Sequence, residues 1–155
     1  MACFTLEREI GAPIERVFDA SCDFRRAPEH IERIVHTEVL TDGPTRLGTR
    51  FRETRAMFGK EHTEEMEVVA FAPNQSYALG CESHGCRYHT ELRFEPTGGE
   101  RAGTKLSMTF QAEPLTLAAK VMSVLMRPML KSCMKEMNHD LDDLKRVLEA
   151  PQAVG

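Results

Sequence analysis

The sequence predicts an α+β fold in which a curved antiparallel sheet of six to seven strands wraps around a long C-terminal helix, with two short helices after the first strand. Apolar and polar residues alternate with a period of two over most of residues 31–112, which indicates strands. Apolar residues three or four apart over residues 130–148 indicate an amphipathic helix. The length of 155 residues suits one domain, placed at residues 1–150.

The first 30 residues predict one strand and two short helices. Residues 3–10 alternate loosely, as a strand does, and Pro13 suits the first position of a following helix because its missing N–H has no partner there anyway. The side chains of that helix share one face: Ile14, Val17, Phe18 and Ser21. A second helical piece over residues 23–27 is expected to end before Pro28.

The middle of the chain predicts an antiparallel meander, because its alternating runs are separated by short connections. The runs are residues 31–41, 49–57, 61–71, 76–83, 87–95 and 105–112. Turn-forming residues lie between them, including Asp42-Gly43-Pro44, Gly59, Pro73-Asn74 and His84-Gly85.

A long helix is predicted to begin at Pro114 and to end at Pro151, with residues 151–155 as a frayed tail. Pro128 lies inside the helical pattern and should kink the helix or break it in two. No other predicted element is long enough to cover the apolar face of the sheet. The space between helix and sheet is then either a filled core or a pocket.

The composition narrows the function classes. The net charge is −4 without a block of like charge, so sequence-independent nucleic-acid binding is not expected. Five scattered cysteines without a CxxC pair do not form a disulfide framework, and the N-terminus has no apolar signal segment. The longest apolar stretch, residues 115–130, is too short and too charged to span a bilayer. We expect a cytoplasmic monomer or homodimer without an integral membrane segment.

Four short segments carry a resemblance to a known family: APIERVF (residues 12–18), DFRRAPE (23–29), GTRF (48–51) and FAPN (71–74). With the final amphipathic helix, they make the chain resemble the START-like helix-grip superfamily (SRPBCC), in its polyketide cyclase/dehydrase branch, over residues 3–149. The resemblance implies a helix-grip fold with a deep, mostly apolar cavity between the sheet and the C-terminal helix. It implies a small hydrophobic or aromatic ligand of lipid, polyketide or quinone type and no obligatory cofactor.

The predicted strand over residues 60–70 differs in its inward side chains from the corresponding strand of the characterised cyclases of this branch. Their counterpart of residues 60–70 carries inward aromatic, serine and arginine side chains, whereas the inward residues here are His62, Glu64, Met66 and Val68. Met66 and Val68 stand at the serine and arginine positions. A cofactor-independent cyclase or dehydratase, the alternative function, would therefore use Glu64, His62 and Arg55 as its candidate catalytic residues.

A polar set accompanies this departure. If the turn around Gly59 has an even length, Glu53, Arg55, His62 and Glu64 share the face of the sheet that carries Phe51, Met57 and Met66. Such a set could orient the polar group of a ligand or transfer protons. It could also form ordinary ion pairs near a solvated cavity mouth. An odd-length turn would separate the two strands' polar residues.

Methionine is the unusual residue of this composition. The chain has nine Met and no Trp, and five Met lie between Met122 and Met137. They could fill a core, line a compliant pocket wall or face an oligomer interface. We expect at least two of the five to contact the cavity. The full set of expected ligand contacts is Phe51, Glu53, Arg55, Met57, His62, Glu64, Met66, Tyr77, Tyr88, Thr90, Met108, Phe110, Met122, Met126, Met129 and Met137.

A metal site is not expected, although Cys81, His84, Cys86 and His89 have a spacing that zinc sites use. Strand alternation directs His89 to the opposite side of the sheet from Cys81, so the four ligands cannot close around one ion. A third function also stays open, that of a protein-interaction module with a filled cavity.

Overall fold

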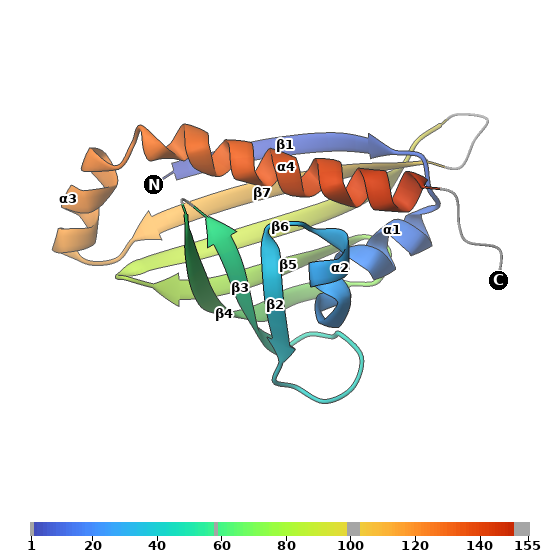
Figure 1. The fold of residues 1–155 in the computed structure, drawn as a ribbon, viewed down its shortest axis with the longest axis horizontal. Helices are drawn as coiled ribbons and strands as arrows, with labels where there is room; N and C mark the ends of the chain where they lie inside the picture. The colour runs from blue at the N-terminus through green and yellow to red at the C-terminus, as the bar shows by residue number, and fades with distance from the viewer. Residues whose placement is uncertain (1, 58, 99–102, 151–155) are drawn as a thin grey trace.

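The computed structural model describes residues 2–57, 59–98 and 103–150. These residues form one antiparallel sheet of seven strands in the order β1-β7-β6-β5-β4-β3-β2 (Figure 1). The strands are β1 (Ala2–Ile10), β2 (Ile34–Val39), β3 (Arg50–Met57), β4 (Lys60–Ala72), β5 (Ser76–Ser83), β6 (Cys86–Pro96) and β7 (Thr104–Pro114). The meander predicted from residue 31 onward is confirmed, and β1 extends it by pairing with β7.

The helices follow the predicted order. They are α1 (Ile14–Ser21), the single 3₁₀ turn η1 (Phe24–Arg26), α2 (Ala27–His30), α3 (Leu117–Leu125) and α4 (Met129–Glu149). The predicted break at Pro128 is confirmed, because α4 begins at the next residue. The predicted end before Pro28 is wrong: Pro28 lies in the first turn of α2, where a helix needs no N–H donor. The predicted frayed tail lies outside the described residues.

The start of the C-terminal helical region also differs from the prediction. Pro114 ends β7, where it pairs with Cys86, so no helix begins there. Instead, Thr116 caps α3, and its side-chain oxygen accepts a hydrogen bond from the Ala119 N–H at 3.0 Å. Hydroxyl side chains are favoured at this position because they satisfy a free N–H of the first turn.

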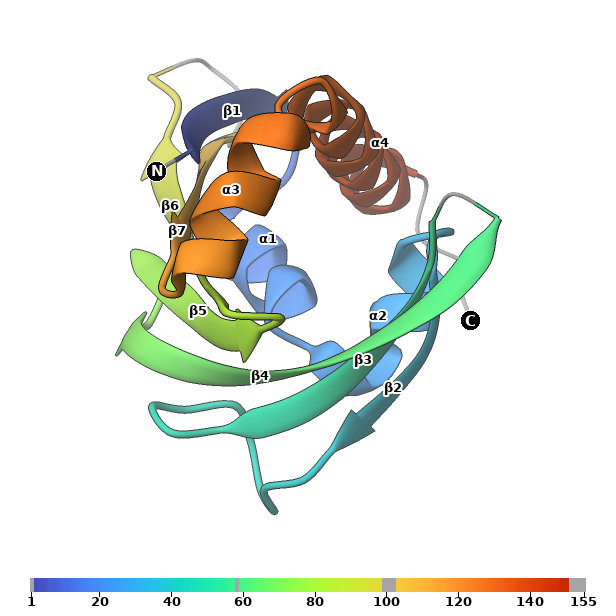
Figure 2. The same ribbon diagram turned by 90° about the vertical axis from the view of Figure 1, so that its left-hand side faces the viewer.

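The sheet curls around the helices, and α4 lies across its concave side (Figures 1 and 2). This is the helix-grip arrangement that the sequence predicts. The packed core lies where α1 meets the second half of α4. There, the ring of Phe18 lies 5.1 Å from that of Phe94 and 5.9 Å from that of Tyr77, and Leu141, Leu144 and Leu148 are buried. Among the described residues, no helix is both long and apolar enough to cross a membrane.

The β3–β4 hairpin has the even register that the polar set requires. Met57 pairs with Lys60, Arg55 with His62, and Glu53 with Glu64. Gly59 adopts the positive φ of 75° that this short connection needs. Inward residues of β3 and β4 therefore face the same side, and Arg50 and Arg52 point outward to ion pairs with glutamates on the convex face.

We predict that Gly85→Ala destabilises the protein more than Gly59→Ala. Both glycines have a φ near 75°, which costs a residue with a Cβ about 1–2 kcal/mol. A Cβ at Gly59 meets no atom within 4 Å, whereas one at Gly85 would lie 2.9 Å from Thr116 Oγ1 and 3.4 Å from the Ala119 Cβ. Chemical denaturation should show that the free energy of unfolding falls by roughly 1 kcal/mol in Gly59→Ala and by roughly 2 kcal/mol in Gly85→Ala. Equal losses would show that the β5–β6 turn does not hold α3 in place.

Candidate functional site

A cavity of about 580 Å³ lies between the concave face of the sheet and α4. Most of its wall is apolar, with side chains from α1, α2, β2–β7 and α4. The apolar residues are Ala20, Phe24, Ala27, Ile31, Ile34, Met57, Met66, Leu79, Leu92, Met108, Phe110, Met129, Met137, Leu141 and Leu144. The cavity extends along α4 from Met129 to Leu144, beside the packed core.

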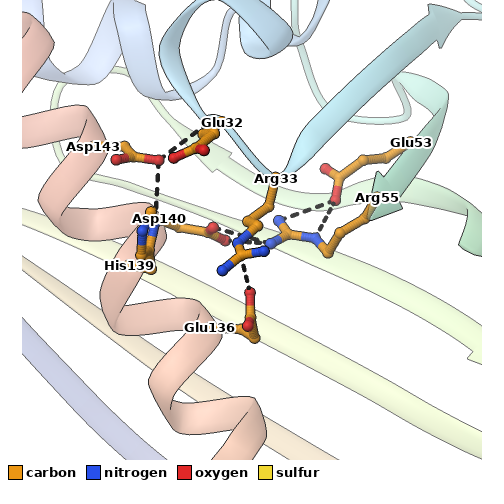
Figure 3. A network of polar contacts seen from close by, with 8 residues as sticks. All are labelled: Glu32, Arg33, Glu53, Arg55, Glu136, His139, Asp140 and Asp143. Atoms are coloured by element: carbon orange, nitrogen blue, oxygen red, sulfur yellow. Dashed lines mark hydrogen bonds and ion pairs between the residues drawn. The ribbon is translucent and has the colours of Figure 1, made fainter. Parts of the chain in front are cut away.

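Three charged side chains, one buried and two partly buried, form a group in the wall of this cavity (Figure 3). Arg55 of β3 lies between Asp140 of α4, at 2.8 Å from Nη1 to Oδ2, and Glu53 of its own strand, at 3.2 Å from Nη2 to Oε1. The side chains of Arg55, Glu53 and Asp140 are 18%, 15% and 9% exposed. We call these three residues the Arg55 trio. It links the β3 edge of the cavity to the helix that covers it.

Burial shapes the ionisation of the trio. Burial raises the pKa of the Asp140 carboxyl from its ordinary 3.8 to about 6, although the Arg55 guanidinium pulls that pKa down. Burial also works to lower the pKa of Arg55, but the attraction of Asp140 and Glu53 is larger and the net shift is upward. Arg55 therefore stays charged, and the Asp140 carboxyl changes its charge near pH 6.

A second polar group attaches α4 to the segment before β2 (Figure 3). The buried carboxylate of Asp143 accepts hydrogen bonds from the Glu32 N–H and from Arg146, both at 3.0 Å, and lies 3.3 Å from His139. Arg33 and Glu136 form an ion pair at 3.3 Å. Ligand atoms of Glu32, His139 and Asp143 lie within 4.8 Å of one another, but the donors already on Asp143 explain its burial without a cation.

The four predicted polar residues do not form one cluster. Glu53 and Arg55 belong to the trio, whereas Glu64 accepts a hydrogen bond from Ser83 Oγ at 3.2 Å and contacts Cys81 Sγ at 3.7 Å. Burial and the nearby Glu64 raise the pKa of the Cys81 thiol to about 11, so it stays protonated. His62 lines the cavity but is exposed to solvent.

Two tyrosines line the cavity in different ways. The Tyr77 hydroxyl is already engaged: it lies 2.6 Å from Ser21 Oγ and donates to the Ser21 carbonyl at 3.0 Å. Tyr88 stacks on Phe110 with ring centroids 5.9 Å apart, and burial raises the pKa of its hydroxyl to about 12. Thr90 lies on the same strand as Tyr88 and also faces the cavity. Tyr88 and Thr90 thus offer uncharged hydroxyls to an occupant.

Three predicted contact residues lie elsewhere. Phe51 is completely buried and stacks on Phe24, with ring centroids 3.9 Å apart, so it belongs to the core below the cavity wall. Met122 and Met126 are 53% and 43% exposed, because the break at Pro128 separates α3 from the helix that covers the sheet. Of the five clustered methionines, Met129 and Met137 line the cavity.

The cysteine–histidine hairpin follows the predicted alternation. Cys81 and His84 line the cavity, whereas His89 does not; it lines a second hollow of about 510 Å³, to which Cys81 also contributes. His89 pairs with Gly80 and Tyr88 pairs with Cys81, so along β6 His89 is out of phase with the residue opposite Cys81.

Sequence reasoning missed Asp140, together with His30, Cys133 and Glu136, all of which line the cavity. A signal for Asp140 exists. It lies three residues after Met137 and four before Leu144, so it stands within the apolar stripe of α4. A carboxylate in such a stripe needs a buried partner, and only the fold identifies that partner as Arg55.

Comparisons with known proteins agree with this architecture. A protein of Thermus thermophilus is 24% identical, with a TM-score of 0.72 over 95% of this chain and 97% of its own. A START superfamily protein of Mycobacterium smegmatis is 15% identical, with a TM-score of 0.70 over 95% of this chain and 97% of its own.

The di-domain ARO/CYC protein StfQ of the steffimycin biosynthetic pathway is 13% identical, with a TM-score of 0.71 over 95% of this chain and 50% of its own. These likenesses concern the fold alone. Among curated proteins, none matches the sequence. The model of the family described as polyketide cyclase/dehydrase and lipid transport matches residues 1–149, so the chain belongs to that family.

Proposed function

We propose that the protein binds a small hydrophobic or aromatic molecule in the cavity between the sheet and α4. The observation that carries this proposal is the cavity itself, which has about 580 Å³ and mostly apolar walls. Ligand pockets of proteins commonly span about 300–1,000 Å³ and combine apolar walls with a few placed polar groups. The methionines in the wall are unbranched and polarisable, so the wall can adapt to related ligands.

The polar groups in the wall favour an uncharged ligand. When both carboxylates are ionised, the Arg55 trio carries one net negative charge. Its two carboxylates accept hydrogen bonds, and Tyr88 and Thr90 add hydroxyls that donate or accept. A ligand with a hydroxyl or N–H group suits this wall better than one with a carboxylate, which the trio would repel.

Two other functions receive less support. A cyclase or dehydratase using Glu64, His62 and Arg55 needs these groups around one substrate atom, yet Arg55 is engaged by two carboxylates and His62 is exposed. An interaction module with a filled cavity does not match the open space beside α4. A resident ligand is testable directly by native mass spectrometry of freshly purified protein, followed by organic extraction.

We expect Met108→Trp to weaken the binding of the neutral probe N-phenylnaphthylamine at least roughly tenfold, because the larger ring occupies the cavity. The matched control is Gln111→Trp, three positions along the same strand on its convex side. The fluorescence of the probe on titration gives both affinities. Equal affinities in the two variants would place the probe outside the cavity and remove the support for the proposal.

The same assay tests whether the cavity binds an uncharged ligand more tightly than a negatively charged one. Anilinonaphthalene sulfonate is the sulfonated analogue of the neutral probe, and we expect it to bind more weakly at neutral pH because the Arg55 trio is net negative. Tighter binding of the sulfonate by the cavity would contradict the preference for uncharged ligands.

A further inference from the structure

One helix face of the molecule is apolar, exposed and outside the cavity. On α3, Leu117, Val121, Val124 and Leu125 are 79%, 55%, 57% and 68% exposed. They follow at positions i, i+4, i+7 and i+8, so they form one stripe along the helix. We call these four residues the α3 face. None of them belongs to the cavity wall, whose α4 side begins at Met129.

The structure fixes the direction of the α3 face. Ala119 is the buried residue of α3, and it packs beside the β5–β6 turn at Gly85. At 100° per residue, the α3 face lies on the opposite side of the helix from Ala119. Figures 1 and 2 show α3 at one end of the sheet, set apart from α4. The face therefore points away from the rest of the chain.

The charged residues of α3 and of the segment that follows it are basic. Residues 114–135 contain Lys120, Arg127, Lys131 and Lys135 and no acidic residue, whereas the whole chain has a net charge of −4. All four basic residues are exposed. An apolar stripe that carries Lys120 and is followed by further basic residues complements a surface that is apolar inside and negative at its boundary, as an anionic lipid layer is.

We propose that the α3 face docks the protein onto an anionic lipid surface. The apolar side chains would enter the boundary between headgroups and acyl chains, and the four basic residues would contact the headgroups. A second copy of the chain is a poorer partner, because an interface between two α3 faces would bring Lys120 and Arg127 of both copies together, and neither α3 contains a carboxylate.

Docking in this orientation has a consequence for the cavity. Met129 begins the cavity wall shortly after α3 ends, and His84 lines the cavity beside the glycine on which α3 packs. This end of the cavity would therefore lie near the lipid. The proposal does not depend on what the cavity binds, and its test uses protein without added ligand.

The test is cosedimentation with vesicles of phosphatidylcholine, with or without about a third of phosphatidylglycerol. We expect the protein to bind the anionic vesicles, and binding to fall in about 0.5 M salt. Each basic residue near an anionic surface contributes a factor of about five, so Lys120→Gln/Arg127→Gln should lose roughly 25-fold. The control Arg25→Gln/Lys60→Gln also removes two exposed charges, but away from α3.

A second pair of variants, one on the α3 face and one control, tests the contribution of the apolar side chains to vesicle binding. Leu125→Asn should weaken vesicle binding roughly tenfold, while Leu47→Asn, with 63% exposure in the loop between β2 and β3, should leave it unchanged. Because the chain has no Trp, Val121→Trp provides a single fluorescent reporter that should shift to the blue on anionic vesicles.

Three outcomes would overturn the proposal. The first is no binding to anionic vesicles, and the second is equal binding to neutral ones with no effect of Lys120→Gln/Arg127→Gln. The third is concentration-dependent self-association in analytical ultracentrifugation that Leu125→Asn abolishes, which would assign the face to a second copy.

Discussion

Replacing Arg55 with methionine is expected to lower the free energy of unfolding by about 3–5 kcal/mol at neutral pH, since removal of one partner leaves buried charge without compensation. Arg55 is the only cation in contact with Asp140 and Glu53 among the ion pairs of the described residues. Methionine keeps much of the side-chain volume, so the loss reports on charge more than on packing. Urea denaturation gives the free energy directly.

Arg52→Met is the matched control for Arg55→Met. Arg52 lies on the same strand and also forms two ion pairs, with Glu38 and Glu65, but its side chain is 51% exposed on the convex face. Exposed ion pairs contribute about 0–1 kcal/mol, so this variant should be nearly as stable as the parent. Equal losses in the two variants would mean that the trio is solvated and that the cavity wall has no buried charge.

Asp140→Asn is expected to remove a stability change of about 2 kcal/mol between pH 4.5 and pH 7. The folded-state pKa of Asp140 is raised from 3.8 to about 6, so the folded protein holds a proton that the unfolded chain releases in this window. The unfolded chain therefore gains stability relative to the folded protein as it ionises, so the contribution of Asp140 to stability falls as the pH rises from about 4 to 6 and is flat above that. Asparagine cannot ionise, so the variant should lack this fall.

Denaturation of the parent and Asp140→Asn at several pH values measures this effect as the difference between two curves. Carboxylates distant from Asp140, with no shared partner, contribute equally to both curves and cancel. Asp142→Asn is a suitable control, because its carboxylate lies on α4 as well but is 62% exposed and pairs with Arg8 at 2.8 Å. If the free energy of unfolding changed with pH in the same way for the parent and for Asp140→Asn, that result would contradict a raised pKa of Asp140 in the folded protein.

The order and type of the elements could be read from the sequence, because period-two and period-3.6 patterns report which faces are buried. The parity of Glu53, Arg55, His62 and Glu64 was also predictable, since one short turn around Gly59 fixes the register of two strands. Errors occurred at Pro28 and Pro114, where proline is compatible with more than one local structure and the neighbouring strand or helix decides.

The methionines show a second limit of prediction from the sequence, because it could not tell which of them line the cavity. A pattern along the chain predicts that Met122, Met126, Met129 and Met137 belong to helices, but not which helix covers the sheet. The break at Pro128 separates the first two from the last two: α4 carries Met129 and Met137 to the cavity, whereas α3 leaves Met122 and Met126 exposed. The interruption between Leu125 and Met129, where the helix changes direction (Figure 1), thus decides their surroundings.

The sequence by itself determined the helix-grip architecture, the inward faces of the strands and the presence of polar residues beside an apolar wall. These features depend on local periodicity and turn length, which the order of residues specifies. Tertiary structure alone decided that Asp140 meets Arg55, 85 positions away in the chain, and that Glu64 turns to Ser83 instead. Such an ion pair forms only where the fold brings side chains from different elements close together and removes them from water. The sequence of a single strand or helix determines neither of these.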